Sequence, residues 1–163
     1  MAGEDTLLGI YLNDHLAGAV AGGDLAKRLA GAERQEAFAR LAAEIEEDRA
    51  ALLDMMAALD VPVRRYKTVL AWAAEKVARL KPNGHVLTRS PLSRVVELEV
   101  LRLGVEGKAA GWRTLRTRAE RDSRLDVVRL DTLIDRATRQ IDELERLRLR
   151  AAAKAFAGDT SGN

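Results

Sequence analysis

The chain has 163 residues, a formal net charge of +2 and no cysteine. A chain of this length forms one compact domain with a real core, and the lack of cysteine excludes disulfides, thiolate catalysis and cysteine-based zinc sites. Because 27 basic residues nearly cancel 25 acidic ones, the charge is only a weak signal for nucleic-acid binding.

The composition and the start of the chain set further expectations. Ala, Leu, Glu and Arg are abundant and aromatic residues make up only 4%, which is typical of an all-α protein. The first residues are acidic, unlike the basic start of a signal peptide, and no apolar run approaches the ~18 residues of a membrane span. We therefore expect a cytoplasmic protein without a membrane partner, with a single domain over 1–157 and a disordered tail over 158–163.

Apolar residues spaced three and four apart predict two long helices in the first part of the chain. One is expected over about residues 5–30 and the next over about 32–59, ending before Pro62. Their short connection predicts an αα-hairpin. A shorter helix is expected over about residues 64–80, followed by a loop.

The second half of the chain predicts another hairpin. Ser90 followed by Pro91 is a strong helix start, because serine caps the first turn and proline fits its first position. This helix is expected to reach about residue 118, and the last to run over about 125–156. Two hairpins joined by a long crossover that holds the short helix predict an antiparallel four-helix bundle.

Glycines recur inside two of the predicted helices. One group lies in the first helix and the other in the fourth: Gly18, Gly22 and Gly23, then Gly104, Gly107 and Gly111. No strand precedes them, so a phosphate-binding loop is not indicated. Since a glycine lets a neighbouring backbone approach, we expect close helix packing at these positions.

Several charged residues fall inside the apolar faces on a helical wheel. The fourth helix has two apolar arcs, one through Leu98 and Leu101 and the other through Leu92 and Leu103, which predicts a central helix with a buried polar line between them. Acids and bases nearly balance, which is typical of a self-satisfied salt-bridge network. The predicted buried network comprises His15, Asp48, Arg49, Glu99, Arg102, Glu106, Arg113, Glu145 and Arg148.

Register places some of these charges at the same level. In a tight hairpin, residues equally far from the turn lie side by side. This predicts His15 opposite Asp48, and Glu99 close to Arg148.

The two-hairpin plan with inward acids resembles the ferritin-like superfamily over nearly the whole chain, at the level of pattern. Members that hold two metal ions supply a Glu from each of two helices and a Glu-x-x-His from each of the others. Here Glu44 is followed three residues later by Glu47, and Glu145 by Arg148, so both Glu-x-x-His motifs are missing. The resemblance implies a divergent member that keeps the bundle and has lost the metal centre.

Two classes of function fit this pattern. We expect a non-enzymatic protein of interaction or assembly type, homo-oligomeric and by preference a dimer, with buried ion pairs and no cofactor. The alternative is a divergent ferritin-like metal-binding protein or oxidoreductase that binds iron or manganese. Its weak candidate ligands are His15, Asp48, Glu99 and Glu106.

Other functional signals are weaker. No nucleophile has an adjacent base, because the two histidines lie on separate elements. Nucleic-acid binding is not expected, because the arginines from Arg113 to Arg124 scatter around the helix among acids. An exposed Trp72 would mark a contact surface, whereas in the opposite interpretation Trp72 and Trp112 both fill the core.

Overall fold

The structure, a computed structural model, describes residues 2–32, 35–64 and 90–157. These residues form four helices and no strand: α1 (Ala2–Ala32), α2 (Glu36–Ala58), α4 (Pro91–Ala119) and α5 (Val127–Phe156). The all-helical fold class is therefore confirmed. The short helix expected over 64–80, Trp72 and the tail over 158–163 lie outside the described residues.

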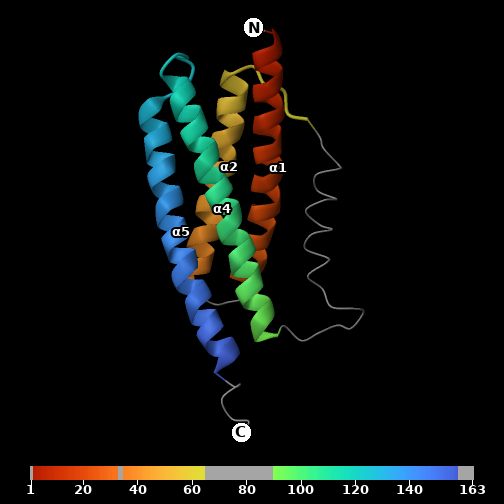
Figure 1. The fold of residues 1–163 in the computed structure, drawn as a ribbon, viewed down its shortest axis with the longest axis vertical. Coiled ribbons are helices and arrows are strands. Elements are labelled where there is room, and N and C mark those ends of the chain that lie inside the picture. The colour runs from red at the N-terminus through yellow and green to blue at the C-terminus, as the bar shows by residue number, and fades with distance from the viewer. Residues whose placement is uncertain (1, 33–34, 65–89, 158–163) are drawn as a thin grey trace.

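The helices pack as a bundle (Figure 1). α1 contacts α2 and α4, and α4 contacts α5 along most of its length. In Figure 1 the chain descends through α1, returns through α2, rises again through α4 and descends through α5. The end of α2 and the start of α4 therefore lie at opposite ends of the bundle.

The core is built from a repeat of three and four residues. In α5 the buried positions are Leu130, Leu133, Ala137, Gln140, Leu144 and Leu147, and α2 repeats the same spacing from Phe38 to Met55. This spacing keeps one seam of each helix facing its neighbours, as in coiled coils. Trp112 is buried in this core, as one interpretation of the tryptophans predicted.

The predicted central position of α4 is wrong. Its arc through Leu98 and Leu101 is buried, but Leu92 and Leu103 on the other arc are 53% and 66% exposed. α4 packs against α5 on one flank and α1 on another, which leaves its outer side in solvent. The polar line between the two arcs therefore lies at the edge of the bundle.

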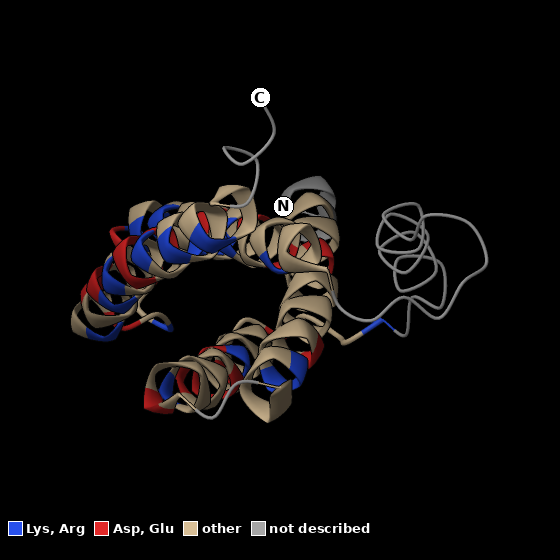
Figure 2. Cartoon of the chain, turned by 90° about the horizontal axis from the view of Figure 1, so that it is seen from below, with Lys and Arg blue, Asp and Glu red and all other residues tan. Residues whose placement is uncertain are grey.

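The surface carries both signs of charge. In Figure 2, Lys and Arg are mixed with Asp and Glu along the helices and do not gather on one side. None of the described helices combines the length and the apolar character that crossing a membrane requires.

Side-chain caps fix the starts of the last two helices. Ser90 Oγ accepts a hydrogen bond from the Ser93 backbone N–H at 3.2 Å, which confirms the predicted start of α4. At α5 the cap is Asp126, whose Oδ1 accepts from the N–H groups of Val128 at 2.8 Å and Arg129 at 3.2 Å. These bonds satisfy N–H groups that have no partner within the helix.

We predict that Asp126→Ala lowers the free energy of unfolding by about 1 kcal/mol, because two N–H groups lose their acceptor. Urea unfolding measures the change. Asp135→Ala, at an exposed position further along α5, is the control and should change stability by less than about 0.5 kcal/mol. Equal losses in both variants would contradict the capping role.

Candidate functional site

One carboxylate lies fully inside the bundle. Asp48 occupies a core position of α2 and is only 1% exposed. Its Oδ2 accepts a hydrogen bond from Lys108 Nζ of α4, and its Oδ1 accepts from Arg136 Nη1 of α5 at 3.1 Å. A buried ion pair was expected at Asp48, and the structure confirms one there.

A glutamine extends this contact. Lys108 also donates to Gln140 Oε1, and Gln140 Nε2 donates to Glu44 Oε2 at 3.0 Å. Burial lowers the pKa of Lys108, and the nearby Asp48 carboxylate opposes that shift. Asp48, Lys108 and Gln140, here called the polar layer, join three helices through one set of hydrogen bonds.

A cavity of about 430 Å³ lies beside the polar layer, between α1, α2 and α4. Most of its wall is apolar, with Leu12, Ile45, Leu52, Leu101, Val105, Trp112 and Leu115 among the lining residues. Its polar lining residues are Tyr11, Asp14, His15, Asp48, Arg49 and Lys108. The cavity therefore combines an apolar wall with a small number of charged groups.

Glycines from two helices line this cavity, among them Gly18 and Gly22 of α1 and Gly104 and Gly107 of α4. A Cβ added at any of the four would meet nothing within 4 Å. The expected close packing at these four positions is therefore wrong, because the space beside them is open. Gly18, Gly104 and Gly107 are exposed and form a rim between α1 and α4.

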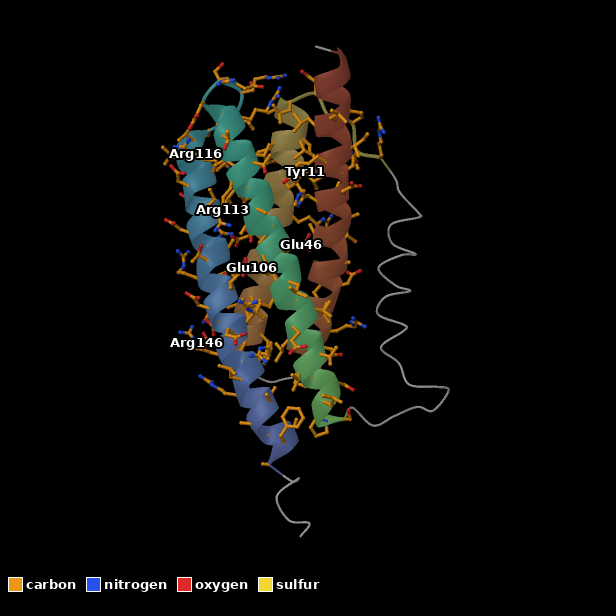
Figure 3. All side chains as sticks on the ribbon, in the orientation of Figure 1. Tyr11, Glu46, Glu106, Arg113, Arg116 and Arg146 are labelled. Atoms are coloured by element: carbon orange, nitrogen blue, oxygen red, sulfur yellow. The ribbon has the colours of Figure 1, made fainter. Side chains whose placement is uncertain are left out.

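Close approach does occur at one glycine. A Cβ at Gly111 would lie 3.1 Å from the His15 ring. His15 packs edge-on against Tyr11 with 4.5 Å between ring centroids, and burial lowers the pKa of His15 despite the opposing charge of Asp14. Tyr11 projects from α1 toward α4 (Figure 3), where its hydroxyl lies 3.0 Å from Thr114 Oγ1. These contacts join α1 to α4 at one end of the cavity.

Most of the predicted buried network forms a chain of ion pairs between α4 and α5. Arg148 pairs with Glu99 at 3.5 Å and with Glu145 at 2.7 Å, which agrees with the predicted neighbours. Arg102 continues the chain to Glu145 at 3.4 Å and to Glu106 at 3.5 Å. The side chains of Glu99 and Glu106 are 46% and 43% exposed, so their predicted burial is wrong.

Three other predicted residues are placed differently. Arg113 is exposed rather than buried (Figure 3), because it lies on the solvent side of α4. Arg49 lines the cavity and pairs with Glu46 at 2.7 Å. His15 lines the same cavity as Asp48. The ion-pair partners of Asp48 are Lys108 of α4 and Arg136 of α5, not His15 of α1.

The weak candidate ligands for a metal do not gather at one point. Across residues 2–32, 35–64 and 90–157, no three His, Asp or Glu side chains are placed to hold one ion. Instead, Asp48 pairs with Lys108, Glu99 with Arg148 and Glu106 with Arg102. Cationic side chains therefore occupy these carboxylates, and binding of iron or manganese stays an untested alternative.

The sequence interpretation missed Lys108, Arg136, Gln140 and the cavity. A signal was present for two of these residues. Lys108 continues the spacing of Leu101 and Val105 in α4, and Gln140 falls in the buried series of α5. A polar residue in a core repeat marks such a layer.

We predict that Asp48→Leu lowers the free energy of unfolding by about 3 kcal/mol, because Lys108 loses its anionic partner in a mostly buried position. Replacing all three layer residues, Asp48→Leu with Lys108→Met and Gln140→Leu, should recover most of that loss. Guanidinium unfolding measures both variants.

The matched control is Glu47→Leu. Glu47 is the next residue in α2 and contacts the same Arg136 at 2.8 Å, but its side chain is 66% exposed. Its loss should cost less than about 1 kcal/mol. Equal effects at the two acids would contradict the special role of Asp48.

Comparisons with family models, with curated proteins and with solved structures find no match for this chain. The ferritin-like resemblance therefore stays a prediction that rests on the helix plan. The function of the cavity has to follow from its geometry and its chemistry.

Proposed function

We propose that this chain is a non-enzymatic binding protein that holds a small, largely apolar molecule in the cavity between α1, α2 and α4. The observation that carries the proposal is the cavity itself. Its volume of about 430 Å³ falls in the range of about 300–1,000 Å³ that is usual for ligand pockets. Such pockets have mainly apolar walls and a small number of polar groups that orient the ligand.

The glycine rim supports a binding role. Glycine inside a helix costs about 0.5–1 kcal/mol relative to alanine. Alanine would fit at Gly18, Gly22, Gly104 and Gly107 without touching another atom. Close packing therefore does not explain these residues, whereas a wide entrance to the cavity does.

The charged groups of the cavity favour binding over catalysis. Asp48 is held between Lys108 and Arg136, and Arg49 is paired with Glu46. A general base or nucleophile needs a free lone pair aimed at the ligand. These paired charges serve better to orient a molecule than to transfer a proton, and His15 is the lining residue whose lowered pKa favours a neutral imidazole with a lone pair.

We also propose that the helices form an antiparallel, ferritin-like bundle with the polar layer in place of a metal centre. The course of the chain in Figure 1 supports this plan, since α2 ends and α4 begins at opposite ends of the bundle. Lys108 takes the place that a cation would fill beside Asp48. The cavity then lies next to the polar layer, inside the bundle.

Titration with the neutral, apolar fluorophore N-phenyl-1-naphthylamine tests the binding role. We expect saturable fluorescence enhancement with one site per chain. Gly22→Leu should weaken binding at least about tenfold, because the new side chain fills the cavity, while helix stability rises by up to about 0.8 kcal/mol.

Gly31→Leu is the matched control, because Gly31 lies on the same helix, has equally open space and does not line the cavity. It should bind the probe as the unaltered protein does. Absence of binding, or equal binding by a folded Gly22→Leu variant, would overturn the proposed function.

The expected homo-oligomer stays a prediction. Leu92 and Leu103 present apolar side chains on the outer side of α4. Sedimentation equilibrium should show a dimer at micromolar concentration that Leu103→Glu weakens. A monomer in the unaltered protein would reject this expectation.

A further inference from the structure

We propose that the ligand is an amphiphilic monocarboxylate, a carboxylic acid with one apolar tail, whose carboxylate binds near Arg49, Lys108 and Trp112. This inference rests on the proposed function and specifies the chemical class of the molecule in the cavity. It follows from counting which hydrogen-bond donors and acceptors of the cavity wall are already used.

Two buried donors in the wall lack a partner among the described residues. The indole Nε1 of Trp112 is shielded from solvent and unpaired, and Trp112 as a whole is only 2% exposed. The Nε of Arg49 is also buried and unpaired, while its Nη1 donates to Glu46 at 2.7 Å. Both residues also line the cavity.

Lys108 adds a further donor. An ammonium group has three N–H bonds, of which two are directed to Asp48 and Gln140. The third finds no acceptor among the described residues, and Lys108 lines the cavity. Burial lowers the pKa of Lys108, so a second anion nearby would favour its charged form.

The fully buried acceptors of the wall are used, and the half-buried His15 ring keeps the remaining free acceptor nitrogen. Both oxygens of Asp48 accept hydrogen bonds, from Lys108, Arg136 and Gln140. The Tyr11 hydroxyl is engaged with Thr114, and Asp14 lies exposed at the edge. A ligand cation would find no free buried acceptor, whereas a ligand acceptor would satisfy donors that are costly to leave unpaired.

The kind of donor decides between a neutral acceptor and an anion. The wall carries two bases, Arg49 and Lys108, and two acids, Asp14 and Asp48, so its formal charges balance. Two of the unused donors belong to charged groups, and hydrogen bonds from charged donors to a carboxylate are the stronger kind. The remaining wall is apolar, with Ile45, Leu52 and Val105 among its residues. A hydrocarbon tail fits that surface, and its burial supplies a second favourable contribution.

Three ligands with a ten-carbon chain separate these contributions: decanoate, 1-decanol and decylamine. Isothermal titration near pH 7 should give decanoate at least about tenfold tighter binding than decanol, and decylamine the weakest binding. Gly22→Leu should weaken all of them, which identifies the cavity as the site.

Side-chain variants test the donors. Arg49→Met and Trp112→Phe should each reduce the preference for decanoate over decanol by about fivefold, while decanol binding stays within about twofold. Lys27→Met is the control, because Lys27 contacts the same Glu46 as Arg49 but lies outside the cavity. It should leave the preference unchanged.

The outcomes separate the inference from the proposed function. If decanol or decylamine binds as tightly as decanoate, the carboxylate inference is overturned and the cavity remains a binding site. If decanoate binds equally to the Gly22→Leu variant, it binds elsewhere and the inference is also overturned. If neither the tailed ligands nor N-phenyl-1-naphthylamine bind, both proposals are rejected.

Discussion

The ion pair between Asp48 and Lys108 crosses the interior of the bundle and joins α2 to α4. Through Gln140 and Arg136 the same carboxylate is tied to α5. A buried carboxylate is tolerated only when its oxygens are matched by donors, so these helices must keep their relative heights. Apolar layers alone would allow a helix to slide, whereas this polar layer fixes one register.

α1 contributes no residue to the polar layer. The cavity lies on this side of the layer, between α1, α2 and α4. Where the other helices contribute Asp48, Lys108 and Gln140, α1 contributes small residues such as Gly18 and Gly22 to the cavity wall. The contact between the Tyr11 hydroxyl and Thr114, together with the His15 ring beside Gly111, joins α1 to α4 at one end of the cavity. The space thus lies between a fixed polar layer on one side and an exposed glycine rim on the other.

Much of the fold could be predicted from the sequence. Helix positions follow from apolar spacing and the start of α4 from Ser90, because both depend on neighbours along the chain. The burial of Asp48 was also predictable, since it interrupts an apolar series in α2. The partners of Asp48 are harder to predict, because apolar residues such as Ile134 and Ile141 favour an inner face of α5 that leaves out the polar Gln140.

The remaining errors have one physical cause. Whether a helix is central, and how far apart two helices stand, depends on tertiary packing that a helical wheel does not contain. Leu103 is apolar but exposed, so Glu99 and Glu106 lie at the edge of the bundle. In the same way, a Cβ added at Gly107 would meet no neighbour within 4 Å, although its residue type predicts close approach.

A double-mutant cycle between Asp48→Asn and Lys108→Met, measured by urea unfolding, tests most directly whether the polar layer holds the bundle together. We expect a favourable coupling free energy of about 2 kcal/mol, because each residue is the main charged partner of the other in the interior. A coupling below about 0.5 kcal/mol would mean that the two side chains act independently and that the polar layer does not hold the bundle together.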